Sequence, residues 1–318
     1  MHKINIRNTF LEKFLLNYGL YAAMVLIILI FSFLNPNYLT FSNILNIFEQ
    51  SAYFIVVAMG ASLTLIIGEQ DLSVGGVLAG LSVLGAIVMK RDSLLTGIVV
   101  MYVAALFIGI FNGIFVIKAK LPSFIATIAV GYIARGLGAY YTDGATVQGL
   151  PKALTRFAWN RVFGIPIMLF IALIALVVLV YILNFTTFGR TVFSFGANRT
   201  ATSLMGINTS FVGIMAYVLS AIGCCTAALM VLCRSGVARY STLPNLQMEC
   251  IAAAVIGGTS LTGGKGSLPG TAFGVLLLIL VESGLNAMGV SAFWQEVFTG
   301  SIIIVSIVLD SYKTRSNA

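Results

Sequence analysis

The segment from Ile251 to Ser267 reads IAAAVIGGTSLTGGKGS, a glycine-rich run next to an apolar stretch. Its distinctive residues are Gly257, Gly258, Gly263, Gly264, Lys265 and Gly266. A phosphate-binding P-loop needs a glycine five positions before the Gly-Lys pair and Ser or Thr directly after the lysine. Thr259 and Gly266 stand at those places, and the third glycine of a dinucleotide fingerprint would fall at Pro269. The spacing therefore favours a tight, lysine-capped turn between two membrane helices over a nucleotide site.

The composition indicates a chain that lies in a lipid bilayer. Hydrophobic residues make up 59% of its 318 residues, charged residues make up 9%, and the mean hydropathy is +1.03. So few charges cannot coat a soluble globule of this size. The net charge is +8, but the basic residues are scattered through short loops and lack the clusters of a nucleic-acid surface. We therefore expect an all-α, polytopic membrane protein with no nucleic-acid partner.

Apolar runs long enough to cross a membrane recur along the whole chain. A membrane helix needs about 20 mostly apolar residues. The segments that qualify are 18–34, 47–67, 73–89, 95–117, 123–142, 165–185, 211–233, 247–262, 269–288 and 294–310. They predict about ten transmembrane helices in one transmembrane domain over 1–318. Lys and Arg are more frequent on the side that holds both termini, so the positive-inside rule predicts that both termini are cytoplasmic.

Catalytic and metal-binding patterns find little support in the sequence. Cys224, Cys225, Cys233 and Cys250 lack metal-ligand spacing, and we expect them to be small buried side chains. The chain has a single histidine, and no serine-histidine or carboxylate-histidine constellation is apparent. No catalytic, cofactor-binding or metal-binding residue is therefore assigned, and a membrane-embedded enzyme is disfavoured.

Residues 186–210 form the longest expected cytoplasmic segment. Asn198 follows Gly196-Ala197 and suits a helix N-cap, so a short helix from Arg199 to Met205 that ends at Gly206 is predicted. A capped helix against the inner face of the membrane is suited to docking a partner. An ordinary helix connection is the alternative.

Polar residues at membrane depth are candidates for a transport pathway. Arg135 lies inside the fifth segment, and Glu282 and Asn286 share a helix face at a spacing of four. Gln50 lies near an outer helix end, as do Glu49, Glu249 and Glu296, for which interfacial exposure is favoured. An ion pair between Arg135 and Glu282 is the alternative to a pathway role.

Two further patterns have structural interpretations. Asp71 or Ser73 can cap the helix that follows, and this role is favoured over substrate contact, although both remain pathway candidates. Glycines four residues apart at Gly76/Gly80, Gly109/Gly113 and Gly266/Gly270/Gly274 are typical of closely packed membrane helices.

Several motifs in one order resemble the ribose-type permease subunits of bacterial ATP-binding-cassette importers. The resemblance runs nearly end to end through DLSVG at 71–75, LPSFIAT at 121–127, ARG at 134–136, FGR at 188–190, GANRTATSLMGI at 196–207 and the glycine-rich segment at 251–267. It implies the ten-helix importer fold, two five-helix halves of inverted topology and a place in the bacterial inner membrane. It also implies ATPase coupling through Gly196, Asn198, Ala201, Gly206 and Ile207.

The resemblance further implies a set of partners. These are a second permease subunit, identical or not, two cytoplasmic ATP-binding domains and an extracytoplasmic sugar-binding protein. The chain itself contains no ATPase domain, so hydrolysis would belong to its partners. A monosaccharide is the expected solute; nucleosides or other small polar solutes are the alternatives within this class. An ion-coupled secondary transporter with broken helices is the alternative outside it.

Overall fold

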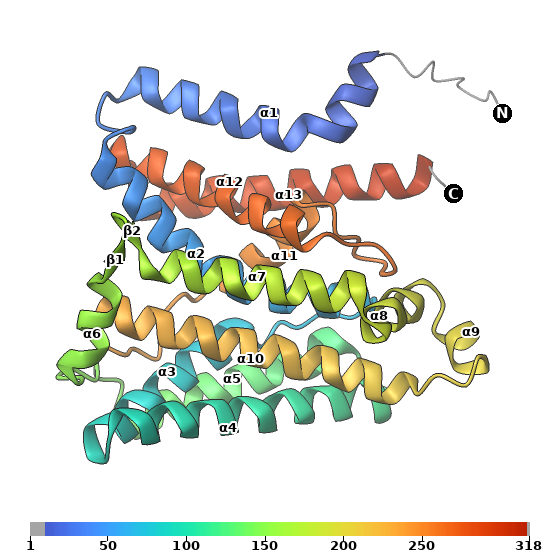
Figure 1. The fold of residues 1–318 in the computed structure, drawn as a ribbon, viewed down its shortest axis with the longest axis horizontal. Helices are drawn as coiled ribbons and strands as arrows, with labels where there is room; N and C mark the ends of the chain where they lie inside the picture. The colour runs from blue at the N-terminus through green and yellow to red at the C-terminus, as the bar shows by residue number, and fades with distance from the viewer. Residues whose placement is uncertain (1–9, 317–318) are drawn as a thin grey trace.

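The long helices of the chain lie side by side in one bundle (Figure 1). The computed structural model describes the backbone of residues 10–316 and the side chains of residues 19–304 and 308. Two of the basic N-terminal residues used for the topology, Lys3 and Arg7, lie outside these ranges. The long helices are α1 (Phe10–Leu34), α2 (Phe41–Ile66), α3 (Val74–Arg91), α4 (Leu94–Gly113), α5 (Ser123–Tyr141), α7 (Ile167–Phe185), α10 (Thr209–Ser235), α12 (Leu268–Ala287) and α13 (Ala292–Ser316). The short elements are η1 (Ile114–Lys118), α6 (Lys152–Trp159), β1 (Arg161–Val162), β2 (Ile165–Pro166), α8 (Thr187–Ala197), α9 (Arg199–Leu204) and α11 (Leu246–Ile256).

The prediction of a mainly helical, polytopic membrane protein is confirmed. Within the described residues, seven helices are long and apolar enough to cross a membrane, and Gly19–Leu34 and α11 are shorter apolar helices. The predicted helix over 247–262 is too long, because α11 ends at Ile256. Gly257 and Gly258 follow, and Gly258 has a φ of +90°, which a helix cannot continue through.

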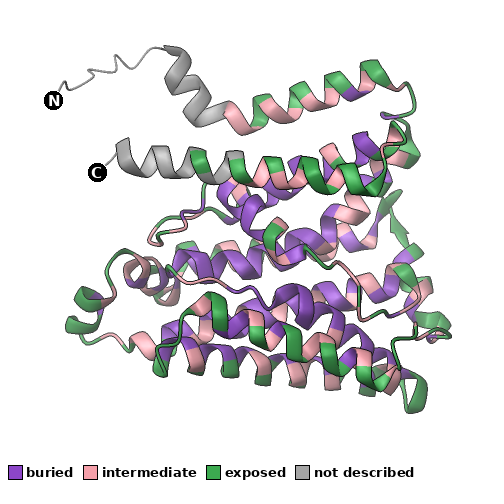
Figure 2. Cartoon of the chain, turned by 180° about the vertical axis from the view of Figure 1, so that it is seen from behind, coloured by how far each residue is buried: buried purple, intermediate pink, exposed green. Residues whose placement is uncertain are grey.

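Burial separates a central set of helices from a peripheral set. Of the 18-residue apolar stretch of α3, 72% is buried, whereas only 17% of the corresponding stretch of α7 is buried. Buried residues concentrate on α2, α3, α10 and α12, and the outer helices turn exposed faces away from the bundle (Figure 2). Helix α5 is unusual because it is only 22% buried and yet is among the least apolar of the seven.

The two halves of the chain repeat one packing scheme, which was not visible in the sequence. Helix α10 packs on α3 and α4 of the first half, and α2 packs on α11 and α12 of the second half. Likewise α3 contacts α4 and α5, as α11 contacts α12 and α13. The loop 67–73 lies against Gly263, whereas Gly236 of the loop 236–245 lies against Thr155 of α6 at the other end of the bundle. The corresponding loops of the two halves therefore lie at opposite ends.

The glycine steps place helix backbones in direct contact, as the spacing predicted. A Cβ atom at Gly109 would lie 2.7 Å from the Val218 Cα atom of α10. Gly76 and Gly80 of α3 likewise face the backbone of α5. Gly270 of α12 faces the Gly257 carbonyl at the end of α11. These positions fix how closely the central helices approach.

The two ends of the bundle differ in structure. Helix α6 and the β1–β2 hairpin lie at one end, and α8 and α9 lie at the other (Figure 1). We call these the α6 end and the α9 end. The first turns of α1 and the last turns of α13 lie at the α9 end. The sequence predicted the short helix α9, but it did not predict α8 or the folded structure at 152–166.

Candidate functional site

A cavity of about 470 Å³ with both apolar and polar lining residues opens at the α6 end, between α2, α11, α12 and α13. Its lining includes the carboxylates of Glu249, Glu282 and Glu296, together with Tyr53, Phe54, Asn245, Gln295 and Thr299. Cavities of 300–1,000 Å³ that combine aromatic walls with a few polar groups are typical small-molecule sites. Carboxylate and amide oxygens of this kind can accept hydrogen bonds from hydroxyl groups.

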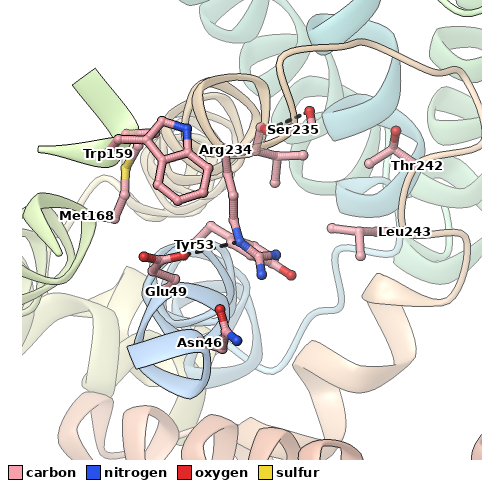
Figure 3. Close-up of a pocket in the computed structure, with 11 residues that line it drawn as sticks. Asn46, Glu49, Tyr53, Trp159, Met168, Arg234, Ser235, Thr242 and Leu243 are labelled. Carbon is pink, nitrogen blue, oxygen red and sulfur yellow. Dashed lines mark hydrogen bonds and ion pairs between the residues drawn. The ribbon is translucent and has the colours of Figure 1, made fainter. Parts of the chain in front are cut away.

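A second cavity of about 410 Å³ shares Tyr53 and Leu243 with the first. Figure 3 shows Arg234 of α10 reaching across it toward Glu49 of α2, and their nearest atoms, Nε and Oε2, are 3.7 Å apart. The Glu49 side chain is 16% exposed and that of Arg234 is 36% exposed. This ion pair therefore joins the two central helices at the α6 end. Trp159 and Met168 lie on one side of this cavity, and Thr242 and Leu243 lie on the other (Figure 3).

The predicted pathway residues are divided between these cavities and the interior of the bundle. Glu282 lines the larger cavity, and the Asn286 Oδ1 atom accepts a 2.8 Å hydrogen bond from Gln295 Nε2. Arg135 donates from Nη2 to the Pro244 carbonyl, 3.5 Å away, at the edge of that cavity. Gln50 is half-buried beside Glu49.

Three acidic residues for which interfacial exposure was favoured also line the cavities. Glu296 is exposed, as expected, whereas Glu49 and Glu249 are half-buried. Arg234 was not singled out, because it follows the predicted segment 211–233 and looks like an ordinary loop charge. The position of Arg234 just after this segment does not indicate its partner, because Glu49 on α2 is far away in the sequence.

Asp71 forms the centre of a buried hydrogen-bond network in the interior of the bundle. Its carboxylate accepts from the Ser73 backbone N–H at 3.0 Å, from Ser73 Oγ and from Ser220 Oγ at 2.7 Å. Asp71 is 3% exposed and Ser73 is 2% exposed. Ser73 stands at the N-cap position of α3, but its hydroxyl bonds to Asp71 and not to the helix backbone. Both residues therefore lie away from the two cavities described above.

Side chains from distant helices satisfy the backbone of the 67–73 loop. Thr127 Oγ1 accepts from the Leu72 N–H at 2.9 Å, and Ser123 Oγ accepts from the Gln70 N–H at 3.3 Å. Tyr217 donates its hydroxyl to the Gln70 carbonyl at 3.1 Å. Irregular backbone at membrane depth needs such partners, because lipid offers none.

The glycine-rich segment packs against α2 and α8 at the α9 end. The Gly264 N–H donates to the Ile66 carbonyl at 2.8 Å, so a backbone amide satisfies the end of α2. The Lys265 side chain is exposed, which differs from the predicted lysine cap. Gly196 of α8 approaches the Ile66 carbonyl and the Gly264 nitrogen so closely that no side chain fits there. Gly263 has a φ of +84° and faces Gly68, and Gly266 faces the Ile66 side chain.

The capped helix predicted after Asn198 is present as α9. Asn198 Oδ1 accepts from the Ala201 N–H at 2.9 Å, and Gly206 has a φ of +78° beyond the helix end. Leu204 is 84% exposed and Met205 is 66% exposed, whereas Ile207 is half-buried. Helix α9 therefore presents an apolar tip beyond the bundle.

Comparison with known proteins assigns the chain to a transport family. Residues 43–307 match the family described as branched-chain amino acid transport system / permease component. The ribose import permease of Haemophilus influenzae is 33% identical over 98% of both chains, and that of Bacillus subtilis is 35% identical over 93% of both. The autoinducer 2 import system permease of Escherichia coli is 28% identical over 94% of this chain and 88% of its own length. No solved structure matches the chain.

The matches cover the parts of the molecule described above. The matched residues 43–307 contain both cavities, the Asp71 network, α9 and the glycine-rich segment. The relatives named as ribose import permeases extend over nearly the whole chain at more than 30% identity. The chain therefore belongs to the branched-chain amino acid transport system permease family and, within it, to the ribose-type permeases of ATP-binding-cassette transporters.

Proposed function

We propose that the chain is the permease subunit of an importer that moves a monosaccharide across the bacterial inner membrane. The observation that carries this proposal is the similarity to ribose import permeases over 98% of the chain. The larger cavity supports it, because its carboxylates and amides suit a neutral solute rich in hydroxyl groups. A single permease domain over 1–318, with ten membrane helices, would form the path.

The proposed pathway starts in the larger cavity. Glu282 would contact the solute, while Asn286 would hold Gln295 and Arg135 would hold the Pro244 loop. Gln50 would act indirectly, beside the Glu49–Arg234 ion pair. Asp71 and Ser73 would serve the path by fixing the 67–73 loop, since both are buried. A binding protein outside the cell would deliver the sugar to the α6 end.

The proposed energy source for transport is ATP hydrolysis by two partner ATP-binding domains that bind at the α9 end. Residues 186–210 would be the coupling segment, and the exposed tip of α9 supports this role. Gly196 and the glycine-rich segment would carry its movement to the end of α2, which they contact directly. The sparse burial of α5, which is among the least apolar of the seven membrane helices, supports contact with a second permease subunit.

The docking proposal predicts the effect of a charge on α9. We expect Ala201→Glu to lower uptake by about tenfold or more, because the new carboxylate would have no partner at the interface with the ATPase. A cost of about 1.4 kcal/mol is enough to weaken this complex tenfold. Uptake and co-purification of the ATPase subunits with the permease would be measured. The control is Ala153→Glu at an exposed position of helix α6, which should retain the ATPase subunits. Normal uptake with normal co-purification in Ala201→Glu would exclude α9 as the docking element.

The proposed orientation and pathway can be tested together by thiol labelling. The four native cysteines are buried, so an introduced cysteine would be the accessible one. With a membrane-impermeant thiol reagent, we expect Phe163→Cys to react in intact cells and Met205→Cys to react only after permeabilisation. Both positions are exposed, at 97% and 66%. Labelling of Met205→Cys in intact cells would contradict cytoplasmic termini.

The same experiment addresses the solute. Glu282→Cys should also react from outside, and the sugar with its binding protein should slow this reaction while leaving Phe163→Cys unchanged. Equal rates with and without sugar would contradict a solute site at Glu282. Uptake by the purified chain in liposomes under an ion gradient alone would instead indicate a secondary transporter.

A further inference from the structure

Arg199, the first residue of α9, links this helix to the end of α4. Its Nη2 atom donates to the Ile117 carbonyl at 3.0 Å. Its guanidinium carbon lies 5.1 Å from the centre of the Phe195 ring on α8. The planar guanidinium can hold a carbonyl with its edge while its face covers an aromatic ring, which an ammonium group cannot do equally well.

The Ile117 carbonyl belongs to a specialised helix end. Residues Ile114–Lys118 form the π-helical turn η1, which continues α4. The Ile114 and Phe115 carbonyls accept from the Ala119 and Leu121 N–H groups beyond the turn. Ile117 is one of the last residues of the helix, where carbonyls lack partners within the helix and attract cations. Arg199 of α9 thus caps the end of α4. π-Helical turns of this kind are frequent at functional sites.

The same stretch of α4 touches the interior network one turn earlier. Asn112 is 1% exposed, and its Nδ2 atom donates to Ser73 Oγ at 3.0 Å. Ser73 in turn donates to Asp71. The Asn112 Oδ1 atom is buried and has no hydrogen-bond partner among the described residues. The Asn112 side chain therefore has an unused acceptor atom, so its hydrogen bonding to Ser73 can rearrange when the neighbouring groups shift.

We infer that Arg199 is a positioning residue that couples α9 to residues 112–118 and, through Asn112 and Ser73, to the 67–73 loop. The inference rests on the proposed docking of an ATPase at α9. When the ATPase displaces α9, the bond from Arg199 pulls the end of α4 with it. Asn112 then moves relative to Ser73, and the loop at membrane depth receives the displacement.

The experiment compares Arg199→Ala, Arg199→Lys and Arg91→Ala in the complete transporter, reconstituted in liposomes with its ATPases and binding protein. Arg91 is an exposed arginine at the end of α3, outside the proposed coupling segment, and serves as the matched control. We expect Arg199→Ala to retain its ATPase subunits and ATP hydrolysis while sugar uptake per ATP falls about fivefold, the low end of measured couplings between sites. Arg199→Lys should restore part of this ratio, because an ammonium can donate to the Ile117 carbonyl. Arg91→Ala should leave it unchanged.

Three outcomes would overturn the inference. The first is a wild-type ratio of uptake to hydrolysis in Arg199→Ala, and the second is loss of ATPase co-purification, which would make Arg199 a docking contact only. The third outcome comes from the double variant Arg199→Ala/Asn112→Ala. If both residues act on one route, uptake per ATP in the double variant should be no lower than in the more impaired single variant. Fully additive losses would contradict the link to the loop. Failure of ATP-dependent uptake by the wild-type complex would refute the proposed function and would be recognised in the same assay.

Discussion

Replacing Asp71 with alanine is expected to abolish uptake and to destabilise the permease by about 3 kcal/mol, since three buried donors lose their acceptor at about 1 kcal/mol or more each. These donors are the Ser73 N–H, the Ser73 hydroxyl and the Ser220 hydroxyl. Neither lipid nor bulk water can replace the carboxylate at this depth. Thermal unfolding in detergent and uptake in cells would measure the two effects.

Two comparison variants separate the hydrogen bonds from the charge. Asp71→Asn should be milder than Asp71→Ala, because an amide oxygen can still accept both bonds from Ser73, and the amide nitrogen can donate to Ser220. Asp92→Ala removes an exposed aspartate at the end of α3 and should change neither property. The structural account of Asp71 would be wrong if Asp71→Ala unfolded at the wild-type temperature.

Replacing Gly270 with valine is expected to prevent assembly of α12 on α11. A Cβ atom at this position would collide with the Gly257 carbonyl and lie 3.1 Å from the Ser267 Cβ atom. Both close neighbours belong to tightly packed segments, so relief requires the two helices to separate. The expected destabilisation is about 3 kcal/mol or more, at the upper end for overpacked cores. The amount of permease recovered from membranes and its unfolding temperature are the measurements.

The control for this prediction is a helical glycine with space around it. A Cβ atom at Gly136 of α5 would meet no heavy atom within 4 Å, so Gly136→Ala should be recovered in normal amounts. Recovery of Gly270→Val at the same level as Gly136→Ala would show that the contact with Gly257 does not limit the packing of α12.

Local patterns in the sequence predicted the features that depend on neighbours in the chain. Apolar runs predicted the long helices, and Asn198 with Gly206 predicted both ends of α9 to within a residue. Glycine spacing predicted the close crossings at Gly109 and Gly270. Each of these signals lies within one helix or one turn, where spacing alone determines which atoms meet.

The features that were missed depend on residues far apart in the chain. The Gly264 N–H caps the end of α2, and the sequence cannot show that residue 264 returns to residue 66. The Glu49–Arg234 pair joins two helices from different halves. Helix α8 went unpredicted because Gly189 and Gly196 look like breakers, although both are needed where the helix meets another backbone. The repeat of the two halves is a repeat of packing, which the side chains do not reveal.

The network around Asp71 has a consequence for the order in which the protein is made. Asp71 and its partner Ser220 are 149 residues apart in the chain. At a synthesis rate of 5–20 residues per second, Ser220 follows Asp71 by about 7 to 30 s. During this interval α2 and α3 have been synthesised, but the hydroxyl groups of Ser220 and Tyr217 do not yet exist. Until then, the polar groups of the 67–73 loop must find hydrogen-bond partners in water or in the insertion machinery. Helix α3 can therefore become fully buried only after α10 has been synthesised.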